Sequence, residues 1–149
     1  VKDVGESDVI LRPQFGNKAG KAMRFNQAEL CTEIKRVGQR FQELTGKTID
    51  PIWRAPGGKT SERLIAMGEQ CGYKHIGWSA SGFLGDELDS KRYPNAALLD
   101  KASKGLKHGD IAIAHLGIWS REDPWAPAVL EPLIENWKKR GFCFALIPN

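Results

Sequence analysis

The feature that most constrains this chain is an alternation of helix and strand patterns between residues 26 and 147. Helical spacing of apolar residues predicts helices over 26–44, 61–71, 96–106 and 128–139, and short apolar runs predict strands over 51–54, 74–78, 111–114 and 142–147. Because each strand is separated from the next by a helix, we expect parallel strands with helical crossovers. The pattern predicts an α/β fold, either part of a barrel or an open sheet.

Capping signals place the ends of the first two helices. Asn26 can accept a hydrogen bond from the first turn, and Glu29 stands at the capping-box position three residues later. Gly46 suits a left-handed turn at the end of that helix. Thr60 or Ser61 is expected to cap the second helix.

Length and composition favour one globular domain. The 149 residues are 41% apolar and 27% charged, so we expect a single domain over 1–149, with 1–25 as an irregular N-terminal segment in which 8–12 could form one strand. The start has neither an initiator Met nor an apolar signal region, so we expect a fragment or a processed form. No apolar run approaches the ~18 residues of a membrane span. The net charge of +4 is spread along the chain, which argues against a nucleic-acid surface.

The three cysteines are widely spaced and form no C-x-x-C motif. Cys31, Cys71 and Cys143 each lie in an apolar context. An odd number with this spacing argues against a disulfide framework and against a zinc site. We predict three buried thiols.

Polar and aromatic residues gather where predicted strands end, which is where sites form in parallel α/β folds. The segments are 54–58, 78–82 and 115–119. His115 directly follows an apolar strand, and an imidazole there can serve as general acid or base. The alternative is a histidine at the edge of the core whose ring bonds a backbone carbonyl.

Arg54 and two glycines form the first of these strand ends. A guanidinium at the floor of a cleft can orient a carboxylate, although Arg54 could equally form a surface ion pair. Gly57 and Gly58 allow close approach of the backbone, so an N–H group could face a developing oxyanion. The alternative is a tight turn before the next helix.

Three tryptophans could line a sugar-binding surface. Trp78, Trp119 and Trp125 lie near predicted strand ends, and their flat apolar faces suit pyranose rings. Packing in the core or in loops is the alternative for each of them. His75 and His108 are assigned to structure or surface.

Together these segments resemble the C-terminal portion of the polysaccharide deacetylase family, also called the NodB-homology domain or carbohydrate esterase family 4. Residues 54–58 read Arg-Ala-Pro-Gly-Gly and match its R-x-P-[YG]-G motif. Trp78, with the loop to Asp86, is similar to its Trp and acidic loop. Residues 111–115 are similar to its apolar strand that ends in His. The likeness covers roughly residues 16–147.

The resemblance implies a partial or distorted (β/α) barrel that removes acetyl groups from chitin, peptidoglycan or related glycans. A divalent, zinc-like metal held by one Asp and two His would activate water. His115 would be the general acid, Arg54 would orient the base, and the Gly57 N–H would help the oxyanion. Trp78 would line the acetyl pocket. Asp86 is the nearest carboxylate that could tune His115.

The metal-binding half of that pattern is missing from this sequence. No T-F-D-D motif occurs, and the H-x-x-x-H positions would fall on Lys18 and Ala22, neither of which is a useful zinc ligand. Either an upstream segment or another chain supplies the ligands, or this chain is a degenerate relative. The metal ligands are therefore not identifiable in this chain.

Three functional hypotheses follow. The first is a hydrolase of amide carbon–nitrogen bonds in acetylated polysaccharides or oligosaccharides, with Arg54, Trp78 and His115 around one cleft. The second is an inactive glycan-binding relative, and the third is an α/β interaction module. A partial barrel leaves a parallel edge exposed, so we expect a complementary upstream segment or a homodimer. The resemblance favours the cell envelope or periplasm.

Overall fold

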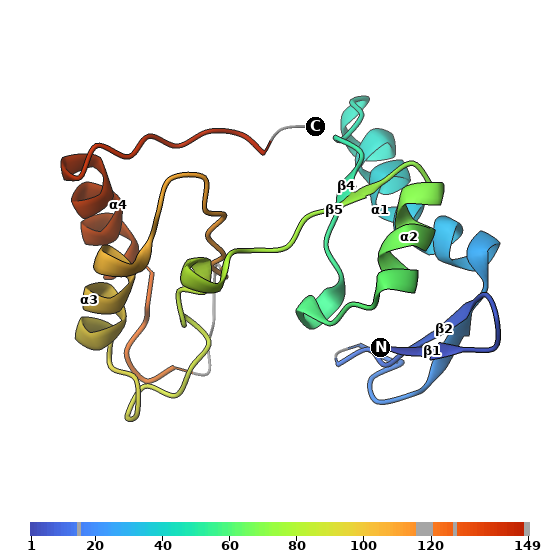
Figure 1. The fold of residues 1–149 in the computed structure, drawn as a ribbon, viewed down its shortest axis with the longest axis horizontal. Helices are drawn as coiled ribbons and strands as arrows, with labels where there is room; N and C mark the ends of the chain where they lie inside the picture. The colour runs from blue at the N-terminus through green and yellow to red at the C-terminus, as the bar shows by residue number, and fades with distance from the viewer. Residues whose placement is uncertain (15, 116–120, 127, 148–149) are drawn as a thin grey trace. The chain divides into compact units, whose positions relative to one another are not determined.

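The computed structural model describes residues 1–14, 16–115, 121–126 and 128–147, which form two compact units. Unit 1 runs from Val1 to Gly77 and unit 2 from Trp78 to Ile147, and each is described by itself (Figure 1). The prediction of a single domain over 1–149 stays a prediction. Among the helices of the described residues, none has both the length and the apolar character that crossing a bilayer requires.

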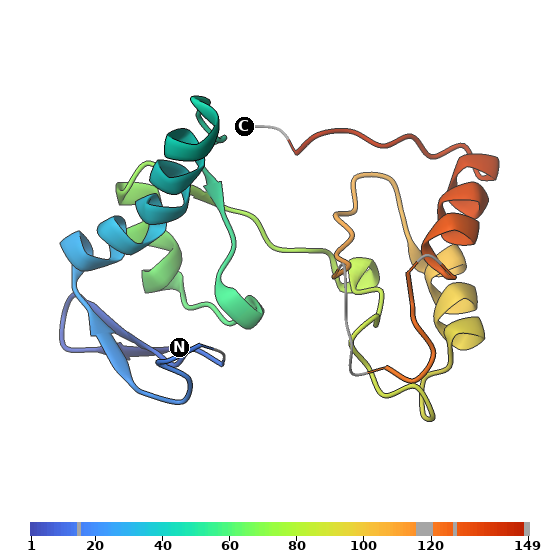
Figure 2. The ribbon, with the colours of Figure 1, turned by 180° about the vertical axis from the view of Figure 1, so that it is seen from behind.

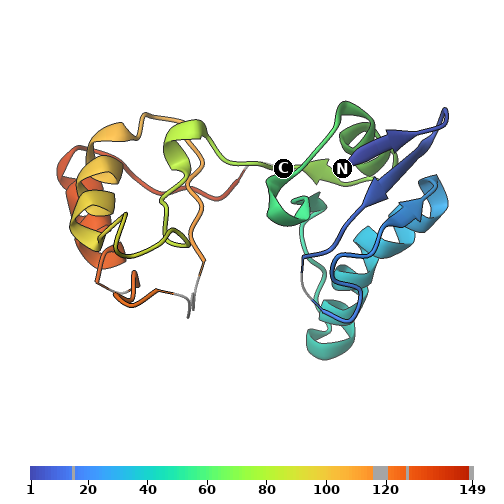
Figure 3. The ribbon, with the colours of Figure 1, turned by 90° about the horizontal axis from the view of Figure 1, so that it is seen from below.

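Unit 1 begins with a three-stranded antiparallel sheet, where the sequence predicted an irregular segment. The strands are β1 (Lys2–Val4), β2 (Asp8–Leu11) and β3 (Met23–Phe25), in the order β1-β2-β3. Figure 3 shows β1 and β2 running beside each other. These strands are too short for a clear alternating pattern in sequence, and they are stabilised by pairing with one another and by burial of Val9 and Phe25. Predicted strand 8–12 is confirmed as β2.

Unit 1 contains two α-helices, and their ends agree with the capping signals in the sequence. Helix α1 (Gln27–Thr45) starts with the capping box of Asn26 and Glu29, and Gly46 ends it in the left-handed region with φ 69°. Helix α2 (Glu62–Gln70) is capped by the Ser61 side chain, which accepts from the Leu64 N–H. Both helices can be followed in Figure 2. Their apolar faces and β2 enclose a core of buried residues: Val9, Phe25, Leu30, Ala55, Leu64 and Met67.

A disulfide joins these two helices, so the prediction of three thiols was wrong. Cys31 lies in α1 and Cys71 follows α2, and their Cα atoms are 5.1 Å apart. The two helices pack against each other, which brings together residues 40 positions apart in sequence. Spacing along the chain carried no information on this contact. Cys143 is a free thiol, and it is exposed rather than buried.

Parallel pairing is confirmed by the two strands that flank α2. Strand β4 (Ile52–Trp53) pairs with β5 (Lys74–His75) in the register Trp53↔His75. Helix α2 is therefore a crossover between parallel strands, as predicted. The sheets of the described residues are not closed, so barrel character remains a proposal.

Unit 2 contains one further parallel contact, the bridge between Phe83 and Ile113. The Ile113 N–H donates to the carbonyl of Gly82 at 2.9 Å. A Cβ at residue 82 would lie 2.0 Å from the carbonyl oxygen of Ile111, so only glycine allows this approach. The predicted strand 111–114 is thus reduced to one bridge.

The predicted strand 142–147 is not formed. These residues are assigned to neither helix nor strand, and Leu146 is 94% exposed. A strand is stabilised by the partner that completes its hydrogen bonds, and no β-pairing to this segment exists among the described residues. Its apolar composition alone produced the wrong prediction.

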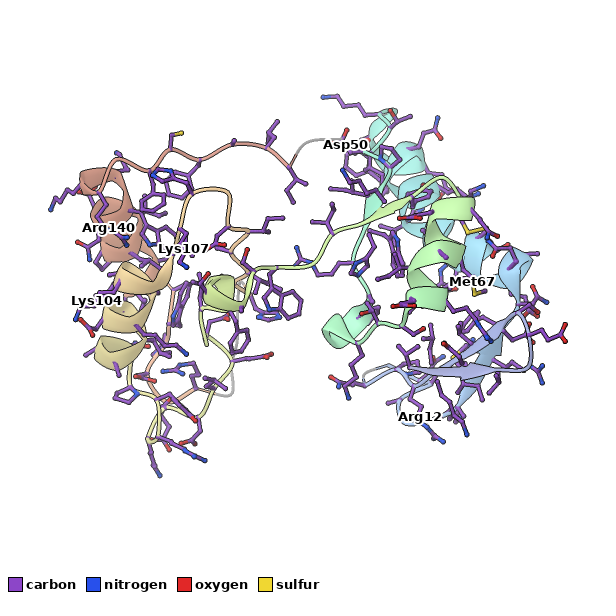
Figure 4. The ribbon with its side chains drawn as sticks, viewed as in Figure 1. Arg12, Asp50, Met67, Lys104, Lys107 and Arg140 are labelled. Carbon is purple, nitrogen blue, oxygen red and sulfur yellow. A yellow bond between two sulfur atoms is a disulfide. The ribbon has the colours of Figure 1, made fainter. Side chains whose placement is uncertain are left out.

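The core of unit 2 lies between two helices, α3 (Asn95–Gly105) and α4 (Leu130–Lys139). Trp137 donates its indole N–H to the carbonyl of Ala102, and Arg140 donates to the carbonyls of Ser103 and Leu106. Figure 4 shows Arg140 near Lys104 and Lys107, where α3 ends. The buried core consists of Leu84, Leu98, Ala102, Leu106, Trp125, Val129, Leu133 and Trp137.

Candidate functional site

Two predicted site residues of unit 2, Asp86 and His115, are in direct polar contact. One carboxylate oxygen, Oδ2, accepts the His115 backbone N–H at 2.5 Å and lies 3.1 Å from the ring nitrogen Nδ1. The Asp86 side chain is 1% exposed, whereas that of His115 is 42% exposed. A buried carboxylate therefore fixes one edge of an imidazole whose other edge is open.

The backbone explains why these two residues meet. Asp86 and His115 stand three and two residues beyond the paired residues Phe83 and Ile113, so the parallel bridge delivers both to one end. Gly85 turns the chain with φ 76°, and a Cβ there would lie 2.8 Å from Leu98. Glycine is required at this turn on both grounds.

A second carboxylate lies near the open edge of the imidazole. Glu87 Oε2 is 4.0 Å from His115 Nε2, and the Glu87 side chain is half exposed. With Asp86 holding Nδ1, the nitrogen that can exchange a proton with a ligand is Nε2. This arrangement suits general acid or base chemistry at Nε2, with Glu87 beside it.

A buried arginine fastens the loop that follows Asp86. Arg121 donates to the carbonyls of Leu88 at 2.5 Å and Tyr93 at 3.0 Å, and to Asn95 Oδ1 at 3.1 Å. It also pairs with Asp123 at 2.8 Å, and its own side chain is 1% exposed. Charge-assisted bonds to several acceptors hold this loop in one geometry.

The second group of predicted site residues belongs to unit 1. Arg54 follows β4 and donates from Nε to the carbonyl of Ile76 at 3.3 Å. Gly57 lies in a single turn of 3-10 helix, Pro56–Gly58, with φ 65° and ψ 13°, a conformation that favours glycine. Arg54 and Gly57 lie on the same short loop, and both are exposed. Their convergence with Trp78 and His115 stays a prediction.

The tryptophans have separate surroundings. Trp78 is half-buried at the first position of unit 2. Trp125 is 4% exposed inside the core, which is the packing alternative rather than a sugar-facing position. Trp119 lies outside the described residues. His108 is an exposed residue whose ring stacks on Phe142.

The implied divalent metal finds no ligand set in what the structure describes. Lys18 and Ala22 are both exposed, and neither residue type binds zinc usefully. Across the described ranges, no group of three or more His, Cys, Asp and Glu side chains is arranged to hold a metal ion. The described residues therefore do not fit the metal.

Comparison with solved structures shows which known fold this chain shares. A family 4 carbohydrate esterase from Streptomyces lividans, solved with acetate, matches 83% of this chain with a TM-score of 0.63 and 20% identity. A family 4 pseudoenzyme from Bacillus anthracis matches 79% with a TM-score of 0.60 and 14% identity. This chain has the fold of part of a family 4 carbohydrate esterase. The likeness at this identity concerns the fold alone.

Sequence comparison finds a relative that has no assigned function. An uncharacterized 30.6 kDa protein from the region 3′ of fumA in Geobacillus stearothermophilus is 29% identical over 114 residues. No family model matches the chain. The chain spans 40% of that relative's length, and 58% and 38% of the esterase and the pseudoenzyme. A mutant of the pseudoenzyme, described as having restored enzymatic activity, matches equally well with a TM-score of 0.60.

Two residues beside the predicted site were missed from the sequence. Glu87 is not among the predicted site residues, although its place next to Asp86 in an acidic loop is a usable signal. His75 is predicted to be structural or at the surface, and its Nε2 accepts the backbone N–H of Ala55 at 3.3 Å, a structural contact whose partner the sequence did not indicate. The signal for His75 was its position opposite Trp53 in the strand pair that carries the Arg54 loop.

Proposed function

We propose that this chain is part of a polysaccharide deacetylase-type hydrolase that removes acetyl groups from N-acetylated amino-sugar glycans. The observation that carries the proposal is the Asp86–His115 pair, because a buried carboxylate contacts Nδ1 of an imidazole whose side chain is 42% exposed and whose Nε2 lies 4.0 Å from Glu87. In an amide hydrolysis, Nε2 would give its proton to the leaving amine. The shared fold with a family 4 carbohydrate esterase supports this class of chemistry.

The other site residues have supporting roles in the proposal. Arg54 would orient the carboxylate that serves as base, and the N–H of Gly57 would face the oxyanion. Trp78 would line the acetyl pocket, and Trp119 remains a candidate for contact with the sugar. The divalent metal expected for this activity would need ligands other than the described residues.

Acetate release tests the proposal on the natural gene product that contains these residues. N-acetylglucosamine oligomers are the substrate, and His115→Ala should lower kcat by about 10² to 10⁴-fold, the usual contribution of a positioned acid or base. His108→Ala is the matched control, because this exposed histidine stacks on Phe142. Absence of acetate release from the wild-type protein, or equal rates in both variants, would defeat the proposal.

An inactive glycan-binding relative is the second candidate, favoured by the absence of a metal ligand set among the described residues. It predicts saturable binding of oligosaccharides without release of acetate. Trp78→Ala should weaken that binding, since a pyranose ring would stack on the indole. Unchanged affinity in this variant, or turnover by the wild type, argues against it.

Location and partners complete the proposal. Disulfides persist in oxidising compartments, so the Cys31–Cys71 link supports the cell envelope or periplasm as the place of action. The glycan is the proposed ligand. A complementary segment or a second copy of the chain would cover the open strand edges and supply what a complete barrel needs.

A further inference from the structure

At the end of the β4–β5 pair, hydrogen bonds to side chains take the place of the next backbone–backbone hydrogen bond. The Ile76 N–H donates to the carbonyl of Trp53 at 2.8 Å, so the next rung of a parallel ladder would join the Ala55 N–H to the carbonyl of Ile76. That rung is replaced on both sides. His75 Nε2 accepts the Ala55 N–H, and Arg54 Nε donates to the Ile76 carbonyl.

This replacement lies at the start of the loop that carries Arg54 and Gly57. Ala55 is 2% exposed and belongs to the core of unit 1, whereas Arg54 before it and Gly57 after it are exposed. The bond to Ala55 therefore acts at the one buried point of the loop. The register that pairs Trp53 with His75 sets where that point lies.

His75 is held in the orientation that this bond requires. Its ring meets the Trp53 indole edge to face, with centroids 4.9 Å apart. A lone pair on Nε2 is needed to accept an N–H, so the ring must be neutral with its proton on Nδ1. Burial, and then the positive charge of Arg54, lower the pKa of His75 below its ordinary value, which favours this neutral form.

We infer that His75 is a positioning residue that fixes the Arg54–Gly58 loop by accepting the Ala55 N–H in place of the missing backbone rung. The importance of this loop for catalysis rests on the proposed function. The positioning itself concerns only unit 1 and is measurable without any substrate. Protonation of His75 would turn its acceptor nitrogen into a donor, and the loop would then lose this anchor.

Amide NMR of the full chain tests the inference through Ala55. In the wild type, the Ala55 amide shift should titrate together with the His75 ring, with a midpoint below the ordinary histidine pKa of 6.5. His75→Phe keeps a ring against Trp53 but removes the acceptor. It should abolish that titration and speed hydrogen exchange at Ala55 by about tenfold, the factor that one ordinary hydrogen bond is worth.

Two further variants make the test decisive. His75→Gln offers a carbonyl oxygen that does not titrate, so it should restore slow exchange at Ala55 while the pH dependence stays absent. His108→Phe, a histidine change in unit 2, should behave as the wild type. An Ala55 amide that is indifferent to His75→Phe, or that still titrates in His75→Gln, overturns the inference. If His75→Phe fails to fold, His75→Gln alone decides.

Acetate release separates this inference from the proposed function. If the wild type releases acetate, His75→Phe should lower kcat more than it raises KM, and His75→Gln should recover the rate and flatten its pH profile in the acidic range. If no variant releases acetate, the proposed function fails. The Ala55 measurements still judge the role of His75 in that case.

Discussion

At the residue scale, Asp86 is the predicted site residue whose burial has the clearest consequence for stability. It is fully buried, and its Oδ2 accepts the His115 backbone N–H, while its Oδ1 has no hydrogen-bond partner within the part of the chain that is described. A buried acceptor is costly to lose, because the donor that it served is then left unsatisfied. Asp86 therefore contributes to stability as well as to the orientation of His115.

Asp86→Asn should lower the free energy of unfolding by about 1 to 3 kcal/mol, the cost of leaving a buried polar group unsatisfied. The reason is that the amide oxygen takes the place of Oδ2, which leaves the buried NH2 without an acceptor among the described residues where Oδ1 stood. Urea unfolding measures the difference. Glu87→Gln is the matched control, since Glu87 is half exposed and its change should stay within about 0.5 kcal/mol. Equal stability of the two variants would contradict this account.

How much of the site could be predicted differs from residue to residue. His115 and Asp86 were predicted from the strand end and the acidic loop, and the structure brings them into contact because parallel pairing joins such ends, while their catalytic role stays a prediction. Trp125 was placed at a sugar-binding surface although it packs in the core, since sequence does not tell which face of a loop turns inward. The sequence does not show that His75 lies against the Ala55 N–H or that Glu87 lies near the His115 ring, because these are contacts between residues far apart in the chain.

At the element scale, helices were predicted well and strands poorly. The ends of α1 follow from Asn26, Glu29 and Gly46, which act locally on the backbone. Strand β5 has two residues where five were predicted, because each strand residue depends on a partner elsewhere in the chain. The segment 142–147 forms no strand, because it has no pairing partner among the described residues.

The link between α1 and α2 should be a major source of stability for unit 1. Closing a loop over a separation of 40 residues is worth about 4 kcal/mol by chain entropy. Replacing both Cys31 and Cys71 by Ser should therefore lower the free energy of unfolding by up to about that amount. Urea unfolding followed by far-ultraviolet circular dichroism measures it.

The control for this prediction is the remaining cysteine. Cys143→Ser should leave the unfolding midpoint unchanged, because Cys143 is exposed and forms no disulfide. Adding a reductant to the wild type should reproduce the effect of the double substitution. A wild-type midpoint that does not respond to reductant would refute the role of the link.

Acid should weaken the turn that leads into residues 111–115. Asp110 accepts the Ser81 hydroxyl at 2.5 Å and the Lys107 backbone N–H at 2.9 Å, and these bonds hold the pKa of Asp110 below its ordinary value of 3.8. A carboxyl whose pKa is lower in the folded state stabilises the fold above the unfolded pKa. That contribution is lost as the pH falls through the folded-state pKa.

The melting temperature as a function of pH checks this expectation. Below about pH 3.8, the melting temperature should fall less steeply in Asp110→Asn and in Ser81→Ala than in the wild type. Thr48→Ala, which removes an exposed hydroxyl from unit 1, should keep the wild-type slope. The same slope in all four proteins would rule out a contribution from Asp110.

At the scale of the whole molecule, open strand edges and exposed apolar side chains predict association. Among the described residues, the sheet of β4 and β5 has two strands and its edges are unpaired, whereas parallel sheets are normally covered on both faces. Val37 and Leu44 on α1 are 69% and 67% exposed. We expect the chain to bind a complementary segment or a second copy of itself.

Sedimentation velocity over a range of concentrations tests this association. A dimer, or a complex with a second polypeptide, is expected. Val37→Glu should reduce self-association if the exposed face of α1 takes part, whereas Lys35→Glu on the same helix should not, because its side chain is already polar. A monomer at every concentration, with no second polypeptide, would contradict the prediction.

Because two cysteines form a disulfide and the third is an exposed thiol, the number of thiols that react with a label depends on whether the disulfide is oxidised or reduced. Three cysteines are present, and the Cys31–Cys71 link removes two of them from alkylation. Oxidised protein, denatured without reductant, should take up one maleimide group at Cys143, and reduced protein should take up three. Mass spectrometry of maleimide-treated cells would then read the oxidation state of the surroundings in which the protein folded.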